Sequence, residues 1–430
     1  MSNSNTDHMG RPIVVVTGMG VVTSLGQGQQ DNWRDLIAGK SGIRHIKRFS
    51  TEGLRTTIAG CVDFLDVDPY SAPALSIAMA ESAASEAIEQ ADIGKKGDFP
   101  GPLFLATPPT ELEWPQRREI YVEEGTCSSL EGYDRLLSAC RSSKHEDMQR
   151  LFQFASVGEH LADKYGTKGL PISLSTACAS GGTAIQLGVE AIRRGDTDTA
   201  LCVGTDGTVN LEALVRFSLL SALSTRNNPP EGAMASFSKD RDGFVMAEGA
   251  ACLVLESYEA AKARGAKILG VLAGCGEHAD EFHRTRTSPD GLPMIRTITK
   301  ALEDAGLEPQ EIDYVNAHGT STPENDKMEY FSLKQAFSEE VMETTPISSN
   351  KSMIGHTLSA AGAVEAVFSL LTMQNGMIPP TINYNTADPD MGIIDAVPNK
   401  AREADVSAVI SNSFGFGGQN VSVVYGREPK

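Results

Sequence analysis

Short β-branched runs alternate with helix-spaced apolar positions along most of the chain. The run IVVVTGMGVV at 13–22 predicts a buried strand that ends in a glycine turn, and the alanine-rich stretch at 72–93 predicts a helix. PLFLAT at 102–107 predicts a short strand. The charged stretch 110–165, which contains Trp114 and several helical periods, indicates a helical insertion or cap.

Further elements follow this stretch. PISL at 171–174 predicts a strand that leads directly into a helix, and ALCVGTD at 200–206 predicts another strand. GFVMAEGAACLVLES at 243–257 predicts a hairpin turned by glycine.

A similar order restarts at residue 267. KILGVLAGCG predicts a strand, 292–307 predicts a helix ended by Gly306, and IDYVNAHGT predicts a strand that runs into a loop. A polar helix follows. The stretch 406–426 predicts two strands around a glycine-rich turn.

An internal repeat relates the two series. Residues 171–192, PISLSTACASGGTAIQLGVEAI, align without a gap with 346–367, PISSNKSMIGHTLSAAGAVEAV. Both stretches lie between similar strands, so we infer a duplicated α/β unit with halves at 11–258 and 259–430. The two equivalent helices are expected to lie back to back, with their N-termini at one site. The identical positions are Pro171, Ile172, Ser173, Val189, Glu190 and Ala191 with their counterparts.

Charge and hydropathy exclude several functional classes. The formal net charge of −19 argues against non-specific binding to nucleic acid or to an anionic membrane, so neither partner is expected. No apolar run approaches the roughly 20 residues needed to cross a bilayer, so membrane insertion is not expected. The start, MSNSNTDHMGRP, lacks the apolar core of a signal peptide.

The cysteine pattern indicates free thiols. Seven cysteines, an odd number without CxxC spacing, do not form a disulfide framework or a zinc motif. We therefore predict a reducing compartment and a cytoplasmic location. The glycines Gly18 and Gly20 are followed by Thr23 where a dinucleotide fingerprint needs glycine, so they are interpreted as turn residues.

Cys178 lies where a strand-like run becomes a helix-like one. The small residues Gly181 and Gly182 allow close backbone approach, and Ile185 and Val189 belong to a helical apolar stripe. Free N–H groups at a helix N-terminus are expected to depress the pKa of the thiol and to bind an oxyanion. The competing interpretation is an inert packing cysteine, which describes most free cysteines.

Three basic residues and two aromatic residues stand out in the second half. His318, in VNAHGTSTPEND, follows a predicted strand end, where functional groups of α/β proteins often lie. Lys351 and His356 fall in the counterpart of the cysteine turn. Positively charged residues are unfavourable at a helix N-terminus, so we expect these two side chains either to be exposed to solvent or to have a functional role. In NSFGFGGQN, glycines flank Phe414 and Phe416, which fits a hairpin with core aromatics or a mobile aromatic beside a backbone N–H.

Five motifs together carry a family resemblance. STACASGG, VNAHGTSTPEND, SSNKSMIGH, AAGAVEA and NSFGFGGQN resemble the decarboxylating β-ketoacyl-[acyl-carrier-protein] synthases, type II-like, of the thiolase superfamily. The resemblance runs from about Ile13 to the C-terminus. It implies an α/β fold that is thiolase-like, duplicated and five-layered (α-β-α-β-α), with the stretch 110–165 as a helical cap insertion. It also implies a homodimer and an acyl carrier protein whose phosphopantetheine arm bears the acyl and malonyl groups.

The resemblance implies the catalytic roles. Cys178 corresponds to the nucleophile that accepts an acyl chain from a thioester. His318 and His356 correspond to the pair that hydrogen-bonds the malonyl thioester carbonyl and stabilises the enolate formed as carbon dioxide leaves. Lys351 corresponds to the lysine that orders the site. No metal or redox cofactor is required by this chemistry.

Further residues correspond to binding groups of the family. The backbone N–H groups of Cys178 and Phe416 correspond to the oxyanion hole, and Phe414 to an aromatic gate between the two half-reactions. Thr320 and Thr322 correspond to threonines that contact the pantetheine arm. Some members hold a monovalent cation, Na⁺ or K⁺, at positions corresponding to Asn316, Glu365 and Asn412.

Two departures from the family pattern leave the substrate open. A glycine-rich GSGxGG-like segment usually follows the strand at 103–106, where this chain has ATPPTELEWPQRRE. The segment after Cys61 lacks the basic cluster that many relatives present to an acidic carrier. Either docking is expected at one or more of Arg193, Arg194, Lys262, Arg264 and Lys267, or the carrier itself is unusual. We expect a specialised paralogue of the elongation enzyme.

Two other functions remain as alternatives. A polyketide-type ketosynthase would use the same chemistry to make a different product. A non-catalytic partner subunit that sets chain length would keep the fold but lose the nucleophile, and the retained Cys178, His318 and His356 argue against it. A thiolase that acts without decarboxylation is disfavoured because the chain has no cysteine after Cys275.

Overall fold

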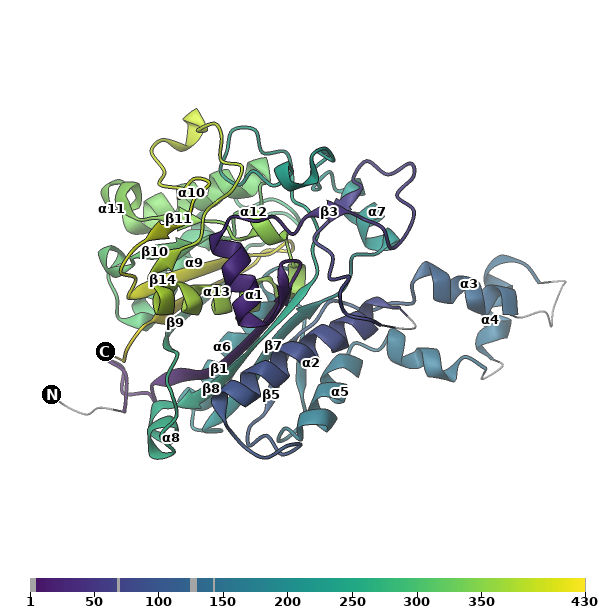
Figure 1. Cartoon of the computed structure of the whole chain (residues 1–430), viewed down its shortest axis with the longest axis horizontal. Coiled ribbons are helices and arrows are strands. Elements are labelled where there is room, and N and C mark those ends of the chain that lie inside the picture. Colours follow the sequence, from purple (N-terminus) through teal and green to yellow (C-terminus); the bar gives the residue numbers. More distant parts are fainter. Residues whose placement is uncertain (1–4, 68–69, 124–129, 142–143, 430) are drawn as a thin grey trace.

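The computed structural model describes residues 5–67, 70–123, 130–141 and 144–429 (Figure 1). Within these residues most strands belong to one eleven-stranded sheet. Its strands, in their order across the sheet, are β11 (Ile347–Ser348), β10 (Tyr314–Asn316), β14 (Ala408–Phe414), β15 (Gln419–Gly426), β9 (Gly270–Ala279), β1 (Val14–Thr23), β8 (Gly249–Ser257), β7 (Thr199–Asp206), β5 (Leu103–Ala106) and β6 (Ile172–Leu174), with β2 (Gly26–Gln27) paired to β1.

Helices cover both faces of this sheet. They are α1 (Gly28–Ile37), α2 (Ala72–Ala91), α3 (Trp114–Glu123), α4 (Gly132–Cys140), α5 (Ser156–Tyr165), α6 (Ser180–Arg193), α7 (Leu211–Leu219), α8 (Tyr258–Ala263), α9 (Leu292–Ala305), α10 (Pro323–Phe337), α11 (Glu339–Thr344), α12 (Lys351–Ile354) and α13 (Ala361–Asn375). Two small antiparallel pairs lie outside the large sheet, β3 (Arg44–His45) with β4 (Ile58–Ala59) and β12 (Met377–Ile378) with β13 (Arg402–Glu403).

The same sequence of parallel and antiparallel pairings is found when the sheet is followed inward from either edge. In the first half β5 pairs in parallel with β6 and β7, and β7 is antiparallel to β8, which joins β1. In the second half β10 pairs in parallel with β11 and β14, and β14 is antiparallel to β15, which joins β9. This is the order that duplication of one α/β unit produces.

Three hydrophobic clusters define the layers. The central cluster contains α6 and α13, represented by Val189 and Phe368, packed on the inner faces of both halves of the sheet. A second cluster lies where α2 and α5 cover the outer face of the first half. A third lies where α9 and α10 cover the outer face of the second half. The predicted five-layered α-β-α-β-α fold is therefore confirmed.

The N-termini of the two central helices touch backbone to backbone. A Cβ atom on Gly181 of α6 would lie 2.5 Å from the backbone nitrogen of Ala363 in α13. A Cβ atom on Gly362 would lie 2.5 Å from the nitrogen of Gly182. Only glycine permits this approach, which brings the loops before both helices to one place.

The glycines of the first strand are not turn residues, contrary to the prediction. Gly18 and Gly20 lie inside β1, which continues to Thr23 and is buried throughout. A Cβ atom on Gly18 would lie 2.0 Å from the carbonyl oxygen of Ala87, and one on Gly20 would lie 2.1 Å from that of Ala83. These glycines therefore let α2 pack directly on the strand.

The predicted hairpin at 243–257 is also wrong. The second part of this stretch is the single strand β8, which lies between β1 and β7. The first part is an extended loop whose Met246 forms an isolated bridge with His356. Sequence alternation could not distinguish a returning strand from a segment that pairs with a distant loop.

The insertion between β5 and β6 is helical, as predicted. In Figure 1, α3 and α4 project from the body of the molecule, whereas α5 lies beside α2. The hydroxyls of Ser85 and Tyr165, 2.8 Å apart, join α2 to the end of α5. Residues 124–129 and 142–143 of the insertion lie outside the described part. In the part of the chain that the structure describes, no helix is long and apolar enough to cross a membrane.

Candidate active site

Cys178 lies on a strained turn between β6 and α6. Ala177 has a φ of +50°, a conformation that side-chain-bearing residues rarely adopt. The turn is closed by the Ala179 N–H, which donates to the Thr176 carbonyl at 3.1 Å. The Ser180 hydroxyl donates to the carbonyl of Ala177 at 2.6 Å and accepts from the Thr176 N–H at 2.8 Å. These bonds direct the Cys178 side chain into a cavity at the N-terminus of α6.

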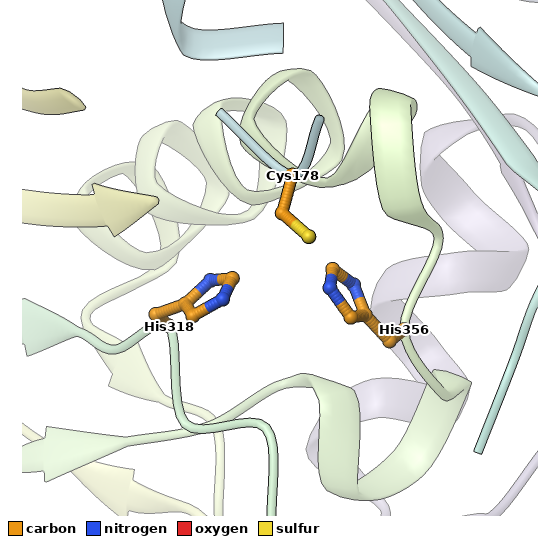
Figure 2. Close-up of side chains that lie close together, drawn as sticks. All are labelled: Cys178, His318 and His356. Atoms are coloured by element: carbon orange, nitrogen blue, oxygen red, sulfur yellow. The ribbon is translucent and has the colours of Figure 1, made fainter. Parts of the chain in front are cut away.

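Two histidines from the second half face the sulfur. Figure 2 shows the Cys178 side chain pointing toward the rings of His318 and His356. The sulfur and the nearest ring nitrogens lie within 4.8 Å of one another. The two rings are nearly perpendicular, with centroids 5.3 Å apart. The structure thus brings together three side chains that are far apart in sequence.

Backbone contacts hold each histidine. The N–H groups of His318 and Gly319 donate to the two carboxylate oxygens of Glu329, each at 2.8 Å. The His356 N–H donates to the Val245 carbonyl at 2.8 Å, and the Leu358 N–H donates to Nδ1 of His356 at 3.2 Å.

Both imidazoles are neutral hydrogen-bond donors or acceptors rather than cations. Burial and the nearby charge of Lys351 hold the pKa of His356 well below its usual value. The same causes, with His356 added, lower the pKa of His318. Because Nδ1 of His356 accepts a hydrogen bond, its Nε2 carries the hydrogen. That Nε2 has no partner among the described residues, so it is a free donor at the site.

The predicted depression of the Cys178 pKa is wrong. Burial raises the pKa of the thiol to about 11. The backbone N–H of Phe416 and the charge of Lys351 act in the opposite direction without overcoming burial. The resting residue is therefore a thiol, and these groups favour the thiolate as it forms.

Lys351 is buried and paired with Glu365. The two side chains form an ion pair, and each is only 1% exposed. Lys351 begins α12 and Glu365 lies in α13, so the pair joins the two helices that flank His356. Burial raises the pKa of Glu365 to about 7, and the Lys351 ammonium opposes that rise.

The glycine-rich turn between β14 and β15 lies beside the cysteine. The Phe416 N–H donates toward the Cys178 sulfur. Phe414 is buried and meets the ring of His318 edge-on, with centroids 6.0 Å apart. A Cβ atom on Gly415 would lie 3.0 Å from the carbonyl oxygen of Thr176. The turn therefore packs closely on the nucleophile loop.

The two predicted arm-binding threonines lie at the start of α10. Their hydroxyl oxygens are 2.9 Å apart, and Thr322 Oγ1 also caps the helix by accepting from the Asn325 N–H at 3.3 Å. Both line a cavity of about 430 Å³ that contains the site. Other residues that line it are Cys178, Phe217, Phe244, His318, His356, Leu358, Phe414 and Phe416.

The three residues expected at a cation site lie behind the histidines. Asn316 donates to the Glu365 carbonyl at 3.0 Å and accepts from Asn350 at 2.9 Å. Asn412 donates to Oε1 of Glu329 at 3.3 Å. Oε2 of Glu365 is buried without a hydrogen-bond partner among the described residues.

These residues fit a monovalent cation. Burial raises the pKa of Glu329 to about 7, and its charge helps to raise the pKa of Glu365. Two buried carboxylates with an orphaned oxygen and neighbouring amide oxygens form the donor set that a hard cation prefers.

Sequence patterns missed two carboxylates near the site. Glu329 lies in α10, eleven residues after His318, and the loop between them folds back so that the Glu329 carboxylate accepts from the His318 N–H. Asp206 ends β7, and its Oδ2 accepts from the Ser359 N–H at 3.0 Å. Its position at the carboxyl end of a predicted strand was an available signal, whereas Glu329 had none.

Three of the five basic residues predicted for docking form ion pairs within the chain. Arg193 is held by Asp304 at 2.7 Å, and Arg264 by Glu256 at 2.6 Å. Arg194 meets Asp196 at 2.9 Å. None of the five predicted residues lines the cavity.

Comparison with known proteins defines first a class and then a family. A duplicated five-layered fold with a cysteine facing two neutral histidines defines the thiolase-like condensing enzymes. The family model described as the beta-ketoacyl synthase N-terminal domain matches residues 11–92 and 118–261, and the C-terminal domain matches 269–385. The chain belongs to the beta-ketoacyl synthase family.

Three individual similarities extend over nearly the whole chain. The chain is 36% identical to "3-oxoacyl-[acyl-carrier-protein] synthase 2" of Coxiella burnetii, over 96% of this chain and 98% of that protein. It is similar to the solved AntDE:AntF structure, a type II PKS acyl-carrier protein in complex with its ketosynthase bound to the hexaketide. The TM-score is 0.85 and the identity 33%, with 97% of this chain and 100% of the other covered. The ishigamide ketosynthase/chain length factor gives a TM-score of 0.83 at 32% identity, covering 97% and 100%.

Proposed function

We propose that this chain condenses an acyl thioester with malonyl-acyl-carrier-protein, releasing carbon dioxide and forming a 3-oxoacyl-acyl-carrier-protein. The observation that carries the proposal is Cys178 facing two neutral histidines in a cavity. The reaction serves fatty acid chain elongation, in a specialised paralogue whose acyl pocket departs from the family where the glycine-rich segment is replaced.

The first half-reaction loads the cysteine. The Cys178 sulfur attacks the acyl carbonyl carbon, the bond to the carrier sulfur breaks, and the thiol proton leaves with the carrier thiol. The N–H groups of Cys178 and Phe416 stabilise the developing oxyanion, which is the role of two preorganised donors. Raising the thiol pKa by burial keeps the resting cysteine protonated until substrate arrives.

The second half-reaction uses the histidines as donors. His356 Nε2–H and His318 hold the malonyl thioester carbonyl as carbon dioxide departs, so the electron pair of the broken bond moves into an enolate. The enolate carbon attacks the acyl carbon on Cys178, and the carbon–sulfur bond breaks. Cys178 leaves as a thiolate, which takes one proton from solvent. Neutral imidazoles suit this role because they donate hydrogen bonds without trapping the enolate by protonation.

Supporting residues complete the site. The Lys351 ammonium favours the ionised carboxylate of Glu365 and the thiolate form of Cys178. Phe414 acts as the gate between the half-reactions, and Thr320 and Thr322 contact the pantetheine arm. A Na⁺ or K⁺ ion held by Asn316, Asn412 and the buried carboxylates would neutralise charge behind the histidines, and no other cofactor is required.

The carrier and a second copy of the chain are the proposed partners. The structure of a related ketosynthase holds an acyl-carrier protein. Strand β6 pairs only with β5 among the described residues, and its Ile172 is 46% exposed. The equivalent edge strand, β11, is fully buried. An unprotected edge with apolar side chains favours pairing with an identical edge in a homodimer.

The cysteines support a cytoplasmic location. All six that the structure describes are free, and three of them are buried in the core. Free thiols are maintained in reducing compartments.

Acyl transfer from carrier thioesters of graded chain length tests the proposal. Mass spectrometry should find the acyl group on the peptide that contains Cys178, and addition of malonyl carrier should convert it to a 3-oxoacyl carrier with loss of carbon dioxide. If no chain length gives an adduct, the proposal is overturned and a non-catalytic partner subunit is favoured.

A polyketide-type ketosynthase is the second candidate, favoured by the similarity to the AntDE:AntF ketosynthase. Supplying malonyl carrier without any reductase distinguishes the two. An elongation enzyme stops after one condensation, whereas a polyketide-type enzyme adds further malonyl units to the unreduced product.

A further inference from the structure

A compact loop between β9 and α9 forms part of the cavity mouth. Its ends are joined by Asp280, whose carboxylate accepts from the Phe282 N–H at 2.9 Å and from the Ser288 N–H at 2.8 Å. Inside the loop, the Thr285 N–H donates to Nδ1 of His283 at 3.1 Å. The loop is therefore internally ordered, and the motif DEFHRTRTS has no role in the chemistry described above.

Two arginines of this loop are unpaired. Arg284 and Arg286 are exposed and line the same cavity as Cys178. Neither guanidinium has an ion-pair or hydrogen-bond partner within the residues that the structure describes. Several other arginines of this acidic chain are paired, since Arg48, Arg193 and Arg264 each meet a carboxylate.

Three acidic residues line the mouth, and two of them have hydrogen-bond partners. Asp280 is used by the loop itself. Asp242 accepts from the Ser224 hydroxyl at 2.7 Å and from the Thr225 N–H at 3.1 Å. Glu324 lies in the first turn of α10, where the helix N-terminus offsets its charge. None of these three carboxylates pairs with the guanidinium group of Arg284 or Arg286.

The loop is also attached to the glycine-rich turn that carries Phe416. The Gly417 N–H donates to the Arg284 carbonyl at 2.8 Å, and the Asp280 N–H donates to the Gly418 carbonyl at 2.7 Å. A Cβ atom on Gly418 would lie 1.8 Å from the Asp280 carbonyl oxygen. An anion held by the arginines would therefore have a fixed position relative to the oxyanion donor beside Cys178.

We propose that Arg284 and Arg286 bind the phosphate of the phosphopantetheine arm while the thioester lies at Cys178. This inference rests on the proposed function, because the carrier-borne thioester of that reaction is what brings a phosphate to this mouth. Planar guanidinium groups form paired hydrogen bonds with phosphate oxygens, which a surface lysine does not match. The site replaces the basic cluster that the segment after Cys61 lacks.

Malonyl-pantetheine and malonyl-4′-phosphopantetheine provide the test, since they differ only in the phosphate. Carbon dioxide release gives kcat/KM for each, and their ratio measures phosphate recognition independently of overall activity. In the double variant R284Q/R286Q this ratio should fall about tenfold, as expected for the loss of charge-assisted contacts at an exposed site. The control K95Q/K96Q removes the same charge from exposed positions after α2 and should keep the original ratio.

A binding measurement keeps the inference separate from the proposed function. Calorimetry with 4′-phosphopantetheine and pantetheine, neither bearing a thioester, should show a preference for the phosphorylated compound that R284Q/R286Q loses. An unchanged preference in R284Q/R286Q would refute the arginine site even if carbon dioxide release proceeds. Preserved phosphate preference with no carbon dioxide release from either thioester would instead refute the proposed function.

Discussion

Lys351 and Glu365 form an ion pair in which both side chains are almost fully withdrawn from solvent. The pair connects α12 to α13 and lies next to His356, so it contributes both to packing and to the charge of the site. Removing one member of such a pair leaves an uncompensated charge in a medium that solvates it poorly.

We therefore expect K351M to lower the free energy of unfolding by about 3–5 kcal/mol, the usual cost of breaking a buried pair. The double variant K351M/E365L, which removes both charges, should recover much of that loss. K334M provides the control, because Lys334 pairs with Glu339 on the surface, and it should leave stability nearly unchanged. Urea unfolding measures all three. A K351M protein as stable as the original would show that Glu365 is neutral in the fold.

C178A should abolish acyl loading. The variant removes the sulfur that receives the acyl group but leaves the two histidines in place. Intact-protein mass spectrometry after exposure to an acyl thioester should show no adduct, while decarboxylation of malonyl thioester continues. An acyl group still attached to C178A would place the nucleophile elsewhere.

H318A should separate the two half-reactions in the opposite way. Loading depends on Cys178 and the N–H donors, so the acyl adduct should still form. Condensation should fall about 100-fold or more, because one donor to the enolate oxygen is lost. Quantifying the acyl adduct and the 3-oxoacyl product in the same sample distinguishes this result from general misfolding, which would abolish both.

The pH dependence of thiol alkylation tests the raised pKa of Cys178. With a pKa of about 11, the thiolate fraction grows throughout the accessible alkaline range. The alkylation rate should therefore rise about tenfold per pH unit up to roughly pH 10, without levelling. Peptide mapping identifies the alkylated cysteine. K351M should slow alkylation at each pH, because loss of the cation raises the pKa further. A rate that levels near pH 7 would instead show that the pKa of the Cys178 thiol is depressed, as the sequence suggested.

The sequence predicted the duplication and which residues the structure brings together at the site, but it predicted the local conformation of several segments less well. The offset repeat placed the cysteine turn opposite the Lys351 and His356 turn, and the two central helices meet there. Gly18 and Gly20 were misread because a strand under a close-packed helix needs glycine as much as a turn does. Glu329 was missed because its contact with the His318 backbone depends on how the loop before α10 folds back, and the spacing of eleven residues does not indicate that path. The thiol pKa was misjudged because burial depends on the surrounding loops and not on the helix terminus alone.

I172K should weaken the proposed homodimer. Ile172 is half exposed on the free edge of β6, where a lysine would oppose its symmetry mate across an antiparallel pairing. Light scattering at graded protein concentrations should show the unmodified chain as a dimer and I172K shifted toward monomer. I393K is the matched control, because Ile393 is also an exposed isoleucine but lies outside the β6 edge strand. A concentration-independent monomer in the unmodified protein would refute the dimer. If I172K forms a dimer as tight as that of the original protein, the interface does not involve β6.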